Sequence, residues 1–267
     1  MPRIALIVAY NGQQYHGWQY QGETLPTVQR DLMRAVATVA DTDITLYCAG
    51  RTDTGVHASK QVVHFDTPNA RPDKAWTMGV NAHLPDAVSV EWAAEVSAGF
   101  DARRTATARR YLYFIHNSRI RSALMAGYVT HEHRQLDEHN THEAAQVLLG
   151  ENDFSSFRAA NCQSQSPMRN LMSVTVSRRQ DLVLVDVMAN AFLHHMVRNI
   201  VGALLDVGAG IRPVDWMAEL LQLRDRNRGS VTASPEGLYL ADVLYPEEFG
   251  LPQGLRLPHF FQVAGLQ

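Results

Sequence analysis

VSVEWAAEV, residues 88–96, places an apolar side chain at every second position of the segment. This period of two predicts a strand with one buried face. A short apolar run at residues 4–10, which ends at Asn11-Gly12, predicts a second and more deeply buried strand. What lies between these strands decides the type of sheet.

Two helical patterns and two further strands fill that interval. Thr27 fits the N-cap of a helix in which apolar residues recur at helical spacing, at Val28, Leu32, Val36 and Val39. Residues 44–49 and 61–65 predict strands, and a short helix is predicted to start near Asp73. The order in the first half is therefore strand, helix, strand, strand, helix, strand.

The second half repeats this order loosely, although the residues themselves do not repeat. A strand is predicted at residues 111–115, followed by a helix that Asp137 caps and Gly150 stops. The remaining predicted elements are a hairpin of residues 172–176 and 182–187, helices at 195–207 and 213–224, and a last strand at 238–245.

The repeated order predicts an α+β fold of two ferredoxin-like (βαββαβ) halves. Such halves form a mainly antiparallel sheet with helices on one face. No Pro-rich or Ser-rich linker separates them, so we expect residues 1–105 and 106–267 to form two closely packed subdomains. A central cleft between such subdomains is the expected place for an active site.

Composition narrows the class of protein. The chain has 267 residues and a formal net charge of −3, but residues 102–131 contain six arginines and no Asp or Glu. A basic segment of this kind can attract an anionic partner. Two cysteines cannot form the disulfide framework of a small secreted domain. Residues 1–18 lack the full apolar core and the cleavage site that are typical of a signal peptide, and no apolar run approaches the length needed to span a membrane. We therefore expect a cytoplasmic protein without a membrane partner.

The sharpest motif is residues 50–57, Gly-Arg-Thr-Asp-Thr-Gly-Val-His, in a loop between two predicted strands. Its two glycines allow a tight backbone path around the single carboxylate of Asp53. On composition alone a turn explains the segment, because Asp beside Gly is common in turns.

This motif resembles the active-site signature of the tRNA pseudouridine synthase A family, whose Asp is catalytic. Further segments resemble the family's sequence in the same order along residues 4–245. They are residues 10–12, 15–19, 61–65, 106–111, 150–154, 194–199 and 236–240. Thr54, where the family usually has Ala, is a mild departure that removes no needed group. The final ~20 residues carry no recognisable motif.

The resemblance implies an isomerase that converts uridine to pseudouridine at positions 38, 39 and 40 of the tRNA anticodon stem-loop. It also implies a homodimer that binds the tRNA anticodon arm. The reaction neither oxidises its substrate nor imports a group, so we expect no cofactor and no metal. It needs one ionised carboxylate, which is assigned to Asp53.

The resemblance also assigns roles to other residues. Arg198 is expected to keep Asp53 ionised, with Arg51 as the second candidate for that role. Tyr111 is expected to contact the target base, and Leu238 to form an apolar wall beneath it. Because a paired uridine must be flipped out of its stem, contacts to the surrounding RNA must offset that cost. The residues expected to supply them are Arg51, Arg71, Arg103, Arg119, Asn161, Cys162, Gln163, Ser164 and Gln165.

Other classes of function fit the sequence less well. Histidines cluster at residues 131–142 and 194–195, but no H-E-x-x-H or C-x-x-C motif supports a metal enzyme. The glycines after residue 201 have the wrong spacing for a dinucleotide site. An Asp53–His57 hydrolase lacks a nucleophile. The alternative that stays open is a non-catalytic RNA-binding protein, although the chain lacks the aromatic RNP signature.

Overall fold

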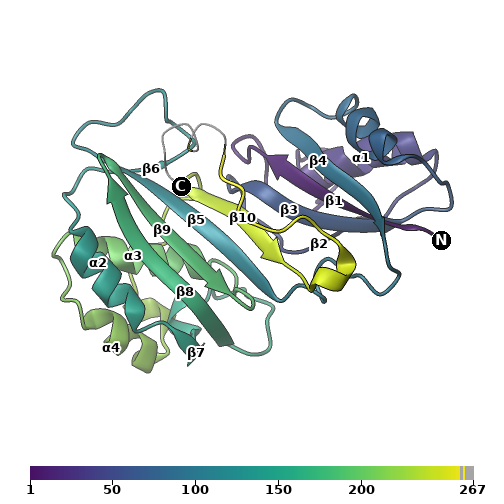
Figure 1. Ribbon diagram of the computed structural model, residues 1–267. Helices are drawn as coiled ribbons and strands as arrows, with labels where there is room; N and C mark the ends of the chain where they lie inside the picture. The colour runs from purple at the N-terminus through teal and green to yellow at the C-terminus, as the bar shows by residue number, and fades with distance from the viewer. Residues whose placement is uncertain (259–260, 262–267) are drawn as a thin grey trace. The chain divides into compact units, whose positions relative to one another are not determined.

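The computed structural model describes residues 1–258 and residue 261 (Figure 1). It divides the chain into two compact units. Unit 1 contains Met1–Thr107 together with the chain from Tyr239 onward, and unit 2 is Ala108–Leu238. The division after Thr107 lies close to the boundary expected after residue 105. The segment from Tyr239, which we had placed in the second subdomain, groups with the first instead.

Unit 1 is built on an antiparallel sheet of β1 (Arg3–Tyr10), β2 (Tyr47–Cys48), β3 (His57–Asp66) and β4 (Val88–Val96). The strands lie in the order β4-β1-β3-β2. This is the strand order of a ferredoxin-like half. The start of β3 also pairs in parallel with β10 (Leu238–Leu244), at His57↔Tyr239 and Ala58↔Leu240.

Helix α1 (Val28–Ala40) covers one face of this sheet and buries Leu32 and Val36. Thr27 caps it, because its side chain accepts a hydrogen bond from the Arg30 N–H. The helix predicted near Asp73 is present, and its central turn, η1 (Ala75–Gly79), has π-helical hydrogen bonding. The predicted N-cap and the predicted strand at residues 88–96 are thus confirmed.

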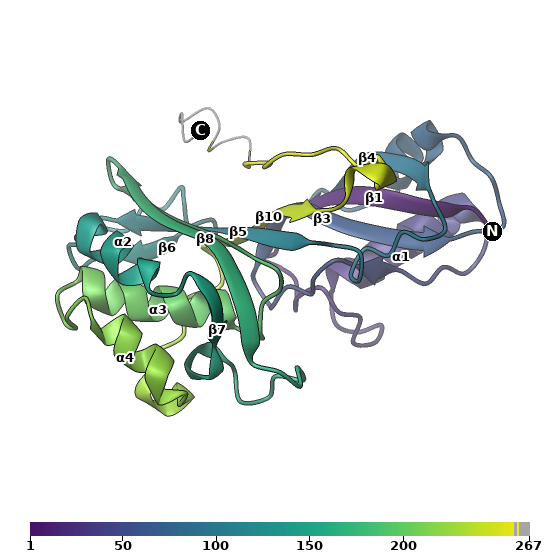
Figure 2. The ribbon, with the colours of Figure 1, turned by 60° about the horizontal axis from the view of Figure 1, so that its bottom comes forward.

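The opposite face of the unit 1 sheet carries the segment that follows β10 (Figure 2). Ser59 and Lys60 of β3 donate hydrogen bonds to the carbonyl oxygens of Arg256 and Gly254. The Lys60 ammonium also lies 2.6 Å from a carboxylate oxygen of Asp242, and both side chains are buried. A buried ion pair therefore fixes the centre of β3 to β10.

Unit 2 has its own antiparallel sheet in the order β5-β9-β8-β7. Its strands are β5 (Ala108–Asn117), β7 (Gly150–Asp153), β8 (Met168–Arg179) and β9 (Leu182–Ala189), and the short β6 (Thr130–Glu132) pairs in parallel with β5. The predicted hairpin of residues 172–187 is therefore confirmed and extends further at both ends.

Helices α2 (Glu138–Gln146), α3 (Met196–Gly208) and α4 (Trp216–Leu223) lie together on one face of the unit 2 sheet (Figure 2). Asp137 caps α2 as predicted. Short 3-10 turns, η2 (Ser155–Phe157), η3 (Arg226–Arg228) and η4 (Glu247–Phe249), complete the elements. Within residues 1–258 and 261, no helix is long and apolar enough to cross a membrane.

Three predicted boundaries were wrong. Only Tyr47–Cys48 of the strand predicted at 44–49 forms a strand, and Ile44 and Leu46 bury their side chains from the irregular backbone before it. Helix α2 ends before Gly150, whose positive φ of 86° starts β7 instead. Helix α4 starts after Pro213, at Trp216. The α+β class and the mainly antiparallel pairing are confirmed.

Candidate active site

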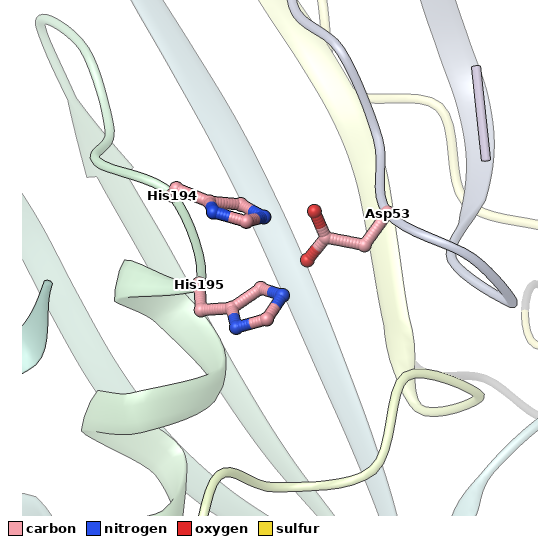
Figure 3. Close-up of side chains that lie close together, drawn as sticks. All are labelled: Asp53, His194 and His195. Atoms are coloured by element: carbon pink, nitrogen blue, oxygen red, sulfur yellow. The ribbon is translucent and has the colours of Figure 1, made fainter. Parts of the chain in front are cut away.

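Asp53 lies in the loop between β2 and β3 of unit 1, and Figure 3 shows its side chain extending from that loop. The side chain is half-buried, while Thr52 and Val56 on either side of it are buried. The Val56 N–H donates to the Asp53 carbonyl over 3.1 Å, which closes a turn around the carboxylate. Gly55 has a φ of 79°, which favours glycine at this place.

Residues 10–18 run alongside this loop and hold it by backbone hydrogen bonds. The Trp18 N–H donates to the Thr52 carbonyl over 3.0 Å, and the Gly55 N–H donates to the Tyr15 carbonyl over 3.3 Å. One bond therefore lies on each side of Asp53. We call residues 10–18 the bracing segment.

Two glycines of the bracing segment allow it to approach the loop. A Cβ at Gly12 would lie 2.0 Å from the Val56 carbonyl oxygen, closer than any real contact. A Cβ at Gly17 would lie 2.7 Å from the Thr52 carbonyl oxygen, and Gly17 has a φ of 84°. Only glycine satisfies both positions, because the neighbouring atoms belong to backbone.

Side chains fix the other end of the loop. The Gln61 side-chain amide donates to the Gly50 carbonyl over 2.6 Å and accepts from the Gly50 N–H over 3.4 Å. The hydroxyl groups of Tyr10 and Thr52 lie 2.8 Å apart and share a hydrogen bond. Both Gln61 and Thr52 are buried, so these bonds form away from water.

His57 ends the motif, and sequence reasoning considered it only as part of the disfavoured hydrolase. The Gly12 N–H donates to its Nδ1 over 3.0 Å, and its ring stacks on Tyr239 with centroids 4.6 Å apart. The side chain is only 1% exposed. Only the presence of His57 in the motif could have drawn attention to it, because its partner lies 45 residues away in the chain.

In unit 2, Arg198 lies in the first turn of α3. Its Nε donates to the Ala233 carbonyl over 2.8 Å, and the Ala233 N–H donates to the Arg198 carbonyl over 3.1 Å. These two bonds tie the arginine to the segment at residues 225–234. The Nε contact sets the direction of the guanidinium.

Buried Asn199 fixes the same segment from the next position of α3. Its amide nitrogen donates to the Phe157 carbonyl over 2.8 Å. Its amide oxygen accepts from Arg226 over 3.0 Å and from Thr232 over 2.7 Å. A turn further along, Gly202 lets the backbone of Val231 approach, because a Cβ there would lie 2.1 Å from the Val231 carbonyl oxygen. The segment against Arg198 is thus held from two sides.

The two apolar candidates are also in unit 2. Tyr111 on β5 is 9% exposed, and its ring meets that of Phe192 edge-on at 5.0 Å. Leu238 begins β10 and is 5% exposed. The structure thus places Tyr111, Arg198 and Leu238 in unit 2, and Arg51 and Asp53 in unit 1.

The residues expected to contact tRNA lie on loops. Arg51, Arg71, Arg103 and Arg119 are exposed. Residues 161–165 form a loop between η2 and β8, where the Asn161 side-chain oxygen lies 3.0 Å from Nδ1 of His194. Figure 3 shows His194 beside His195, and their ring centroids lie 4.0 Å apart. The contact between Asn161 and His194 attaches the loop to the residues that precede α3.

The two cysteines are free thiols in different surroundings. Burial raises the pKa of Cys48 to about 12. At Cys162, burial acts in the same direction, but the N–H groups of His194 and Ser164 and the charge of Arg158 outweigh it and lower the pKa of the thiol. Cys162 is therefore the more reactive of the two.

Comparison with known proteins identifies relatives over most of the chain. The sequence model of the tRNA pseudouridine synthase family matches residues 6–103 and 144–246. A tRNA pseudouridine synthase A from Shewanella sp. (strain W3-18-1) is 55% identical over 251 residues, which is 94% of this chain and 96% of that protein. The tRNA pseudouridine synthase A of Haemophilus influenzae (strain 86-028NP) is 53% identical, over 94% of this chain and 93% of that protein.

Among solved structures, a chain from the crystal structure of a Cbf5-Nop10-Gar1 complex is similar with a TM-score of 0.30 and 12% sequence identity. The likeness covers 75% of this chain and 54% of that chain. It supports no conclusion about the site.

Proposed function

The chain belongs to the tRNA pseudouridine synthase family, and we propose that it isomerises uridine to pseudouridine at positions 38, 39 and 40 of the tRNA anticodon stem-loop. The observation that carries the proposal is the Asp53 loop. It lies within the matched residues 6–103, and hydrogen bonds from the bracing segment hold the backbone on both sides of its carboxylate. We further propose that the enzyme is cytoplasmic and binds the tRNA anticodon arm as a homodimer.

The reaction breaks the bond from uracil N1 to C1′ of the ribose and forms a bond from C5 to C1′. The proton on C5 is lost to a base or to water, and N1 gains one, so the atoms balance without a co-reactant. Asp53 acts as the ionised group, either by attacking the sugar or by removing a ribose proton. The free uracil must be retained and water excluded, because water would convert the reaction into hydrolysis.

The proposal assigns the other candidates to the same uridine. Tyr111 has an aromatic ring that can stack on uracil and a hydroxyl that can help to move the C5 proton. Leu238 supplies an apolar surface for the base. Arg198 is assigned the role of cationic partner to the catalytic carboxylate.

The test of this function uses unmodified tRNA that carries tritium at uridine C5. Forming the new bond must release the label into water, and we expect release with EDTA present and no added cofactor. A folded protein that binds tRNA yet releases no tritium from several tRNAs with uridine at these positions would establish the alternative, a non-catalytic RNA-binding protein.

Replacing Arg198 is expected to affect turnover far more than binding. In Arg198→Ala the charge is lost, and we expect kcat for tritium release to fall by about 10²-fold or more while the tRNA dissociation constant changes less than about threefold. Single-turnover kinetics and filter binding measure the two quantities. Equal losses in binding and turnover would show that Arg198 is an RNA contact.

Bound tRNA is expected to protect Cys162. Iodoacetamide at pH 7.5 should alkylate Cys162 much faster than Cys48, because the thiolate is the reactive form and the two pKa values are shifted in opposite directions. If residues 161–165 contact RNA, saturating tRNA should slow labelling of Cys162 by about tenfold. Mass spectrometry of tryptic peptides measures both sites, and an unchanged rate would remove this loop from the RNA interface.

A further inference from the structure

His57 is buried beside the Asp53 loop, yet the proposed chemistry gives it no task. It lies four residues after Asp53, at the start of β3, and is 1% exposed. Its Nδ1 accepts the N–H of Gly12, the first glycine of the bracing segment, over 3.0 Å. An imidazole nitrogen that accepts a hydrogen bond carries no proton, so this contact requires the neutral ring.

The Gly12 contact lies at one end of a chain of hydrogen bonds that reaches Gly55 in the Asp53 loop. The Gly12 carbonyl accepts from the Tyr15 N–H over 3.0 Å, and the Tyr15 carbonyl accepts from the Gly55 N–H over 3.3 Å. Gly55 is two residues from Asp53. His57 is itself held by β10, through its stacking on Tyr239.

We propose that His57 is a positioning residue, which anchors the bracing segment through the Gly12 N–H and thereby holds the Asp53 carboxylate in its working place. The inference rests on the proposed catalytic role of Asp53. Its physical basis is that a group misplaced by about 1 Å can lower a rate by about 10²-fold, even when the change lies outside the reacting atoms. A role of this kind affects turnover and leaves tRNA binding largely unchanged.

The test compares three substitutions at residue 57. In His57→Asn the side-chain oxygen occupies the same position along the side chain as Nδ1, so it can accept the Gly12 N–H. His57→Leu keeps a similar volume without an acceptor, and His57→Gln places its amide one carbon further out. We expect kcat for tritium release to fall about 10- to 100-fold in the Leu and Gln variants, and less than about threefold in the Asn variant, with KM changed less than about threefold in all.

His64 provides a matched control on the same strand. It is 3% exposed, and its Nδ1 accepts the backbone N–H of Ala102 over 3.1 Å, which is the same type of bond away from the Asp53 loop. We expect His64→Leu to lower the melting temperature about as much as His57→Leu and to leave kcat within about threefold of the wild type. An equal loss of kcat in both Leu variants would overturn the proposal.

The remaining outcomes are also decisive. If the Leu variant does not fold, the Asn and Gln variants carry the comparison, and equal kcat values for those two would overturn the proposal. Wild-type turnover that depends on Asp53 but is unaffected at residue 57 would refute the role of His57 alone. Wild-type protein without tritium release, or an active Asp53→Ala variant, would instead refute the proposed function on which this inference rests.

Discussion

Asp53→Ala is expected to abolish tritium release, with kcat lowered by at least about 10³-fold, while tRNA is still bound. The proposed reaction has no other ionised carboxylate to start it, and loss of the reacting group in an enzyme costs several orders of magnitude in turnover. The Asp53 side chain is half-buried, and the loop that carries it is held by the side chains of Thr52 and Gln61 and by backbone hydrogen bonds, all of which the substitution leaves in place. The fold should therefore persist, and single-turnover release from C5-labelled tRNA is the measurement.

The matched variant is Asp53→Asn, which keeps the shape of the side chain and removes its charge. It should be as inactive as the Ala variant if ionisation is what matters, because an amide neither attacks the sugar nor removes a proton at neutral pH. Filter binding and circular dichroism serve as controls for RNA affinity and folding. Substantial turnover in both folded variants would exclude Asp53 as the catalytic group.

Local rules predicted the elements that depend on local chemistry. Thr27 and Asp137 cap α1 and α2 because a short polar side chain before an apolar helical pattern satisfies the first free N–H groups. The alternation at residues 88–96 gave β4 with the same bounds, because one face of that strand is buried.

Elements that depend on tertiary pairing were missed. β7 is Gly-Glu-Asn-Asp, a polar segment that is a strand only because β8 lies beside it. β6 has three residues and pairs with β5. The π-helical turn at Ala75–Gly79 has the same apolar spacing as an ordinary short helix, so its hydrogen bonding is invisible in the sequence.

The candidate site also has a part that the sequence predicts and a part that it does not. The motif around Asp53 could be found in the sequence because its residues are contiguous. The bonds that hold it join residues far apart in the chain, such as Gly12 with His57 and Trp18 with Thr52. Gly12 and Gly17 stood in matched motifs, but their reason for being glycine is a close approach to the backbone of another segment. No pattern of spacing predicts such an approach.

The largest expected loss of stability follows from Lys60→Met. The Lys60 and Asp242 side chains are 2% and 8% exposed, and the ammonium also donates to the Gly254 carbonyl over 2.8 Å. Removing the cation leaves a buried carboxylate without its counter-charge, which costs roughly 3–5 kcal/mol in the free energy of unfolding. For a chain of this size we expect the melting temperature to fall by roughly 10 °C. Differential scanning calorimetry measures the shift.

Two further variants separate the ion pair from the loss of the lysine side chain itself. In Lys60→Met/Asp242→Leu both charges are gone, and we expect more than half of the lost melting temperature to return, because an apolar pair of similar volume can replace a buried ion pair. Arg34→Met removes the exposed pair with Glu23, whose side chains are 59% and 61% exposed, and should lower the melting temperature by no more than about 2 °C. If the double variant is no more stable than Lys60→Met, Lys60 stabilises the protein mainly through its hydrogen bond to the Gly254 carbonyl, which attaches the segment after β10 to β3.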